Sequence, residues 1–91
     1  MRYRSRTDIV SAILESANGG STKTKIMYKA FLSYSQLKEY LSMLLQNGLL
    51  EYDEARTEYT TTTKGLQFLE TFEQIGEMLP PNQPAKIVEA L

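Results

Sequence analysis

Residues 22–50 constrain the fold more than any other stretch, because they encode two helices separated by a tight break. The second helix has an amphipathic stripe spaced i, i+4, i+7, i+8, made of Leu37, Leu41, Leu44 and Leu45. Ser33 is placed to cap its start, and Gln36 three residues later completes a capping box. Asn47-Gly48 ends it, since glycine tolerates the left-handed conformation that closes a helix. A short helix, a turn and a longer helix form a helix-turn-helix pattern.

A third helix is predicted before this pair. Its buried face is spaced i, i+1, i+4, i+5, i+8 and consists of Ile9, Val10, Ile13, Leu14 and Ala17. Ser5 and Asp8 resemble a capping box at its start, and Gly19-Gly20 stops it. Ser21 or Thr22 then caps the short helix of the pair, whose apolar side carries Ile26, Met27 and Ala30.

The chain after Gly48 is predicted to form a hairpin and a last helix. Residues 49–53 and 57–61 are rich in aromatic and β-branched residues, and residues 54–56 connect them. Thr62 or Thr63 caps the last helix, which Pro80-Pro81 ends. Its apolar residues recur at spacings of three and four: Leu66, Leu69, Phe72, Ile75 and Leu79. The predicted fold class is therefore α+β, mostly helical, with a short tail at 85–91 that could form one or two turns.

The residues on which many enzymes depend are absent from this 91-residue chain. It has no cysteine and no histidine, which excludes disulfides, zinc ribbons and nucleophile–histidine systems. Glu70, Glu73 and Glu77 form a solvated stripe on the last helix rather than a metal site. We predict no enzyme, no metal, no cofactor and no small-molecule ligand.

The sequence also lacks membrane and export signals. No run approaches the roughly eighteen apolar residues of a membrane span. The basic N-terminus has no apolar stretch behind it, as a signal peptide would. We expect no membrane partner and a cytoplasmic location, associated with the nucleoid.

Charge is distributed unevenly along the chain, although the net charge is only −1. Residues 1–38 hold seven Lys and Arg against two acids, a balance of +5, whereas residues 39–91 hold three against nine, a balance of −6. Such an asymmetry predicts one basic working face. Because the basic half coincides with the helix-turn-helix pattern, double-stranded DNA is the expected partner.

The candidate DNA contacts fall into four groups. They are the N-terminal Arg2, Arg4 and Arg6, the first-helix Lys23, Lys25 and Lys29, the second-helix Tyr34, Ser35, Gln36, Lys38 and Ser42, and Arg56 in the hairpin tip. These residue types bind phosphates and base edges. Tyr34, at the start of the second helix, is expected to reach DNA, whereas Tyr28 and Tyr40 are expected at the edge of the core.

Each group also has a structural explanation that does not involve DNA. The outward side of the second helix, with Ser35, Glu39 and Ser42, could be an ordinary solvated face. Gln36 could be fully occupied in capping. Surface lysines are common, and the three arginines could belong to a frayed terminus.

The residues Gly19–Glu51, followed by Tyr59–Glu70, resemble small archaeal winged-helix DNA-binding proteins that dimerise through a C-terminal helix. The matching elements are Thr22-Lys23-Thr24, Ile26-Met27-Tyr28, Leu32-Ser33-Tyr34, Gln36-Leu37, Tyr40-Leu41, Gly48-Leu49-Leu50 and Thr62-Thr63-Lys64-Gly65. The resemblance covers about residues 5–79. It implies a winged helix-turn-helix fold, DNA binding, a homodimer and no enzymatic activity. It divides the chain into a winged-helix domain at 1–65, a dimerisation helix at 66–79 and a Pro-rich break with a short tail at 80–91.

Two departures from that family pattern concern the wing and the last helix. Asp53, Glu54 and Glu58 surround Arg56, so the wing tip is acidic where a phosphate contact is expected. Pro80-Pro81 ends the last helix early, whereas relatives with long coiled-coil arms continue.

The functional hypothesis is a sequence-reading transcription regulator that acts as a homodimer, with helix 33–47 in the major groove. One alternative is a nonspecific chromatin-type DNA binder, which the pI of about 5.4 disfavours. The other is a winged-helix protein-interaction module without DNA binding, which Glu39 and the acidic wing favour and the basic half opposes.

The predicted dimer interface is the apolar far end of the last helix. It comprises Leu69, Phe72, Ile75, Met78 and Leu79. A helix of that length extends beyond one small core, and a contiguous exposed apolar patch usually marks an interface. The alternative is that the tail at 85–91 folds back over the patch within one chain.

Overall fold

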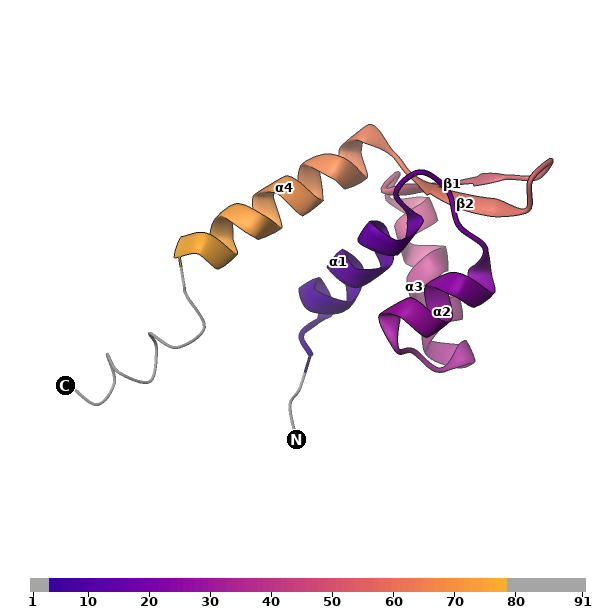
Figure 1. Cartoon of the computed structure of the whole chain (residues 1–91), viewed down its shortest axis with the longest axis horizontal. Helices are drawn as coiled ribbons and strands as arrows, with labels where there is room; N and C mark the ends of the chain where they lie inside the picture. Colours follow the sequence, from indigo (N-terminus) through magenta and orange to yellow (C-terminus); the bar gives the residue numbers. More distant parts are fainter. Residues whose placement is uncertain (1–3, 79–91) are drawn as a thin grey trace.

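A computed structural model describes residues 4–78. The element order is α1 (Arg6–Ala17), α2 (Lys23–Ala30), α3 (Tyr34–Gln46), β1 (Leu50–Asp53), β2 (Glu58–Thr61) and α4 (Thr63–Met78), as Figure 1 shows. All six elements occur where the sequence predicts them. Arg2, Leu79 and the predicted tail at 85–91 lie outside the described residues.

The predicted capping residues act as expected in the first three helices. Ser5 and Asp8 form the capping box of α1, and Ser33 and Gln36 form that of α3. Thr22, rather than Ser21, caps α2 by accepting a hydrogen bond from the amide of Lys25. Local side-chain chemistry therefore fixes where each helix begins.

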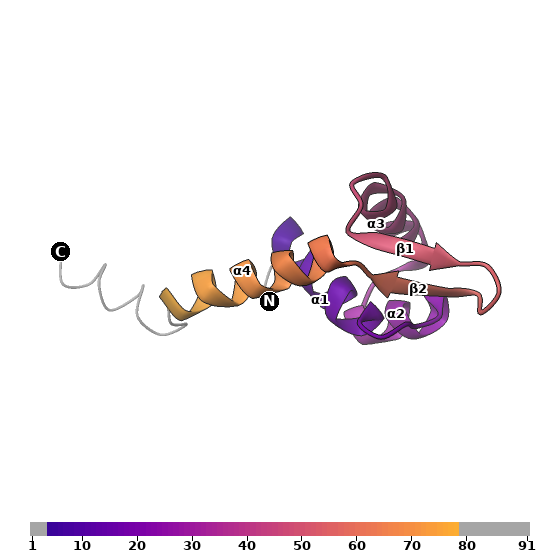
Figure 2. The ribbon, with the colours of Figure 1, turned by 90° about the horizontal axis from the view of Figure 1, so that it is seen from above.

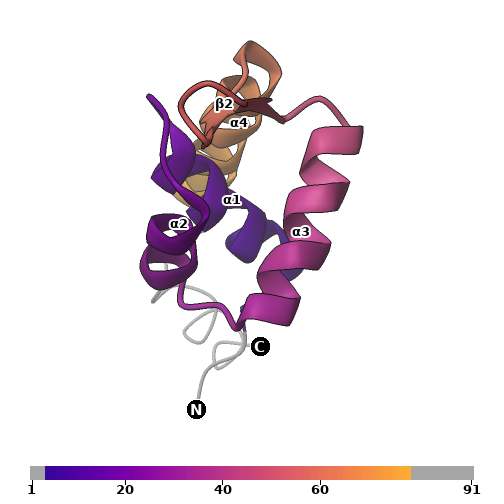
Figure 3. The same ribbon diagram turned by 90° about the vertical axis from the view of Figure 1, so that its right-hand side faces the viewer.

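The core lies between α1, α2 and α3, which pack around one apolar cluster (Figure 3). Its largest fully buried side chains are Ile13, Leu14, Ile26, Leu37 and Leu44. These residues come from the stripes that the sequence analysis identified, so the apolar periodicity translates directly into packing.

The hairpin is antiparallel and places Tyr52 directly opposite Tyr59. Their ring centroids are 4.8 Å apart. Ser21 forms an isolated antiparallel β-bridge with Tyr59. The Ser21 amide donates to the Tyr59 carbonyl at 2.9 Å, and the Ser21 carbonyl accepts from the Tyr59 amide at 2.8 Å. The buried Thr61 hydroxyl donates to the carbonyl of Leu14 at 2.6 Å. These bonds fix the hairpin to α1 and to the start of α2.

The start of α4 is tied to the end of α3. The Thr62 hydroxyl donates to the Gly48 carbonyl at 2.6 Å and accepts from the Gly65 amide at 3.1 Å. The Lys64 ammonium donates to the Asn47 carbonyl at 2.8 Å. Gly65 is buried so closely against the Leu49 carbonyl that a Cβ would overlap it. These contacts set the direction in which α4 leaves the body.

From that start, α4 extends away from the rest of the molecule (Figures 1 and 2). Phe68 and Leu69 are half-buried and pack against the core. Leu66, which the predicted stripe includes, is 43% exposed instead. Phe68, which the predicted stripe omits, packs against the core in its place.

Candidate nucleic-acid interface

The outward side of α3 is a small polar surface. Ser35, Glu39 and Ser42 are exposed, on the side away from Leu37 when each residue turns the helix by about 100°. Gln36 is committed in part to capping, since its Oε1 accepts from the Ser33 amide at 3.1 Å. Ser35 and Ser42 are short hydrogen-bonding side chains that would not obstruct close approach to a groove, whereas Glu39 adds a carboxylate to the same side.

A cationic cluster borders this surface. The Lys23 ammonium lies 5.2 Å from the centroid of the Tyr34 ring, and the Lys38 ammonium lies 5.7 Å from it. Both distances suit cation–π attraction. Tyr34 is 54% exposed, so the ring holds two ammonium groups near each other at the surface. We call Lys23, Tyr34 and Lys38 the tyrosine–lysine cluster.

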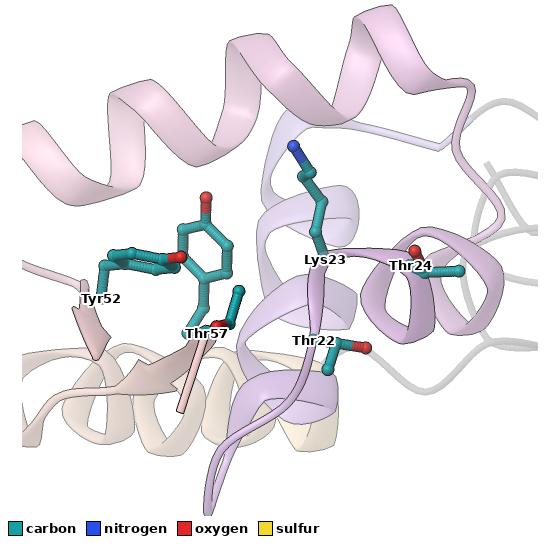
Figure 4. Close-up of a pocket in the computed structure, with 6 residues that line it drawn as sticks. Thr22, Lys23, Thr24, Tyr52 and Thr57 are labelled. Carbon is teal, nitrogen blue, oxygen red and sulfur yellow. The ribbon is translucent and has the colours of Figure 1, made fainter. Parts of the chain in front are cut away.

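A groove separates α2 and α3 from the wing. One hollow of about 290 Å³ extends along the α3 side, and its lining includes Tyr34, Lys38, Leu41, Ser42 and Leu45. A second hollow of about 270 Å³ is lined by Thr22, Thr24, Tyr52 and Thr57, together with Lys23 and Tyr59, which border both hollows (Figure 4). In Figure 4 the Lys23 side chain points from the start of α2 toward α3. The wing groove is therefore polar, aromatic and cationic.

Two of the three acids around Arg56 have contacts within the protein. The Asp53 carboxylate accepts from the amides of Ala55 and Arg56, at 3.0 and 3.3 Å, and so shapes the turn. The Glu58 side chain lies over Gly20, where an added Cβ would be 2.8 Å from Oε1. Arg56 is exposed at the tip. Asp53 and Glu54 stay exposed beside Arg56, so the wing tip is acidic in the structure as it is in the sequence.

The structure does not bring the three lysines of α2 together. Lys25 and Lys29 lie about 200° and 240° around the helix from Lys23, at about 100° per residue. Only Lys23 borders the wing groove. Lys25 and Lys29 therefore lie outside the wing groove, and their predicted DNA contacts stay a prediction.

The two described arginines of the N-terminus have different surroundings. The Arg4 guanidinium donates to the carbonyls of Ala30 and Phe31, at 2.6 and 2.9 Å, and closes the end of α2. This structural role differs from the DNA contact that the sequence predicts for Arg4. Arg6 lines a hollow of about 280 Å³ with Glu39, Tyr40 and Met43, on the side of α3 away from the wing groove.

The tyrosine predictions have mixed outcomes. Tyr40 is half-buried against the core, as expected. Tyr28 is 70% exposed, so its predicted place at the core edge is wrong. Sequence reasoning missed Tyr52 and Tyr59 as groove residues. Their signal was available, because strand alternation places Tyr52 on the same face as Leu50, and Tyr59 on that of Thr61.

Residues 4–78 contain no group of three or more His, Cys, Asp or Glu side chains that could hold a metal ion. None of the described helices combines the length and apolar character needed to span a bilayer.

A model of the family described as winged helix-turn-helix matches residues 3–79. The chain belongs to this family. The predicted winged-helix fold, with its two-stranded wing and C-terminal helix, is confirmed.

Two archaeal proteins are similar to this winged-helix chain. Over 81 residues it is 32% identical to "Uncharacterized protein MJ0290" of Methanocaldococcus jannaschii, an alignment that covers 88% of this chain and 37% of that protein. The chain therefore spans little more than a third of that relative's length. The crystal structure of Sso10a-2, a DNA-binding protein from Sulfolobus solfataricus, superposes with a TM-score of 0.79 at 27% identity and covers 97% of both chains.

Proposed function

We propose that this chain binds double-stranded DNA through the outward side of α3, the tyrosine–lysine cluster and the wing groove. The observation that carries the proposal is the cluster itself, which places two ammonium groups beside the short polar side chains of α3. In a winged helix the second helix of the pair enters the major groove, and flanking cations bind the phosphates. The similarity to Sso10a-2, a DNA-binding protein, supports the same partner class.

The division of roles follows from the positions of the side chains. Lys23 and Lys38 would contact phosphates, since ammonium groups bind phosphates without reading sequence. Ser35 and Ser42 would face base edges from the exposed side of α3. Arg56 would contact a phosphate from the wing tip, where Asp53 is engaged in the turn.

We propose further that two copies associate through the far half of α4. Ile75 is 52% exposed and Met78 is 78% exposed, while Phe68 and Phe72 stack with ring centroids 6.4 Å apart. A second α4 would bury these side chains. Leu69 packs partly on its own core, so its share in this interface would be smaller than that of Ile75 and Met78. A two-fold pair of winged helices would bind a roughly palindromic site, as a transcription regulator does.

The test compares two variants that lose the same charge. Lys23→Ala combined with Lys38→Ala removes the cluster's cations, whereas Lys25→Ala combined with Lys29→Ala removes two cations outside the wing groove. Fluorescence anisotropy with a random-sequence duplex, at several salt concentrations, gives the slope of log affinity against log salt. We expect the first variant to flatten this slope by about two units and the second to change it little.

Two results would contradict the proposal. The first is equal slopes for the two variants, which would place the docking face elsewhere. The second is wild-type chain that does not bind duplex DNA at low salt. Selection from a random pool then separates sequence reading from nonspecific binding, because Ser35→Ala and Ser42→Ala should alter the selected site only if α3 reads bases.

A further inference from the structure

We propose that the chain has a second nucleic-acid surface, which binds single-stranded DNA on the outward side of α2 and the turn that follows it. The surface consists of Lys25, Tyr28, Lys29 and Phe31, which we call the α2 platform. It goes beyond the proposed duplex-binding function and does not include the tyrosine–lysine cluster or the wing groove. Figure 3 shows that the α2–α3 turn lies at the end of the body opposite the sheet.

The first observation is that two aromatic side chains of this surface are exposed to solvent. Phe31 is 82% exposed and Tyr28 is 70% exposed, one helical turn apart at the end of α2. An apolar ring in water gains nothing for folding. Both rings therefore offer faces on which a planar ligand can stack.

The second observation is the backbone at Phe31, which adopts φ 56 and ψ 53. This left-handed conformation is disfavoured for a bulky side chain, and glycine would adopt it without strain. The Arg4 guanidinium stabilises this conformation by donating hydrogen bonds to the carbonyls of Ala30 and Phe31. The chain thus displays a phenyl ring at a position where the fold itself favours glycine.

The third observation is charge. Lys25 and Lys29 are exposed and lie one turn apart on the outward side of α2. Residues 16–38 contain four lysines and no acid, so no carboxylate of this segment competes for the two cations. The α2 platform is accordingly complementary to a sugar–phosphate backbone.

These three features favour single-stranded nucleic acid over duplex DNA and over a protein as the partner of the α2 platform. Single-strand sites combine cations along the backbone with aromatic rings on which unpaired bases stack. The bases of a duplex already stack on one another, so exposed rings would gain little there. Lysine is depleted in the cores of protein–protein interfaces, which disfavours a protein partner for a surface with two lysines among four residues.

The test uses a labelled, unstructured DNA 12-mer of mixed sequence and fluorescence anisotropy. Phe31→Gly and Tyr28→Ala remove the two rings, and each should weaken binding by between about five- and a hundredfold. Neither variant threatens the fold, because glycine relieves the left-handed strain and Tyr28 is exposed on a helix. Thermal unfolding monitored by circular dichroism should therefore show no loss of stability.

The matched control is Tyr34→Ala, which removes an exposed tyrosine of the other surface. It should leave single-strand affinity within about twofold while it weakens duplex binding, and Phe31→Gly should do the reverse. Lys25→Ala with Lys29→Ala should flatten the salt dependence of single-strand binding.

The result that would overturn the inference is wild-type affinity for the single strand in folded Phe31→Gly. Binding of an RNA 12-mer but not its DNA equivalent would also overturn it. If the wild-type chain binds single strands through Tyr28 and Phe31 but does not bind duplex, the proposed duplex function fails and the α2 platform stands. If it binds duplex but no single strand, only the α2 platform fails.

Discussion

The two halves of α4 have similar apolar periodicity and different surroundings. In the first half, Gly65 is buried against the Leu49 carbonyl and Leu69 packs on the core. In the second half, Ile75 and Met78 are exposed to solvent. A periodic stripe therefore identifies an apolar face but not what covers it. One chain covers the first half, and we propose that a second copy covers the other.

The first half of α4 bears on function because it is bonded to the residues that follow α3. Thr62 and Lys64 bond to the carbonyls of Gly48 and Asn47, directly after the helix proposed to enter the major groove. The angle at which α4 leaves the body would therefore set the distance between two α3 helices in a dimer. Changes in either half of α4 should have distinct consequences, in stability for the first and in association for the second.

The largest stability effect is expected for Gly65→Ala. A Cβ at this position would overlap the Leu49 carbonyl oxygen and lie 2.6 Å from the methyl carbon of Thr61, so helix or hairpin must shift. Overpacking of this kind destabilises by about 1–3 kcal/mol. Urea unfolding at fixed protein concentration measures the change in the free energy of unfolding.

The matched change in the second half is Gly76→Ala. No atom of residues 4–78 comes within 4 Å of a Cβ at Gly76. In a helix interior alanine is more favourable than glycine by about 1 kcal/mol, so this variant should be no less stable than wild type. A loss as large as that of Gly65→Ala would show that both halves are closely packed and would remove the contrast.

A smaller effect is expected for Lys64→Met, which keeps the side-chain length and removes the ammonium. Its bond to the Asn47 carbonyl is exposed, and water can replace it. The expected loss in the free energy of unfolding is below about 1 kcal/mol. If the same urea titration shows a larger loss than Gly65→Ala, the junction depends on the ammonium rather than on the close contact of backbones.

Features determined by nearby residues were predictable from the sequence. Ser5, Ser33 and Thr22 cap helices because each side chain bonds to an amide three residues later. The hairpin follows from aromatic and β-branched residues on both sides of a short connection. Each of these interactions joins residues that are close in sequence, so it does not depend on the tertiary arrangement.

Features that depend on contacts between distant segments were not predictable. Arg4 bonds to carbonyls 26 and 27 residues away, and nothing near Arg4 indicates that partner. The turning of Phe68 toward the core depends on how Thr62 and Gly65 meet the end of α3. The separation of Lys23 from Lys25 and Lys29, by contrast, was predictable from the sequence, because it follows from helical periodicity alone.

The most direct test of the central proposal is the composition of the protein–DNA complex. Sedimentation velocity with a short labelled duplex, chosen by selection, measures how many chains each duplex carries. The comparison is between wild type and Ile75→Glu combined with Met78→Glu, which places two carboxylates in the far half of α4. Because both side chains are already exposed, the winged-helix body should fold unchanged in the variant.

We expect wild type to sediment as a dimer without DNA and to place two chains on each duplex. The variant should sediment as a monomer and bind the same duplex more weakly, since it loses the gain from linking two sites. A wild-type chain that stays monomeric and places a single chain on the duplex would contradict the dimer. A wild-type chain that leaves the duplex unbound would contradict the proposed function itself.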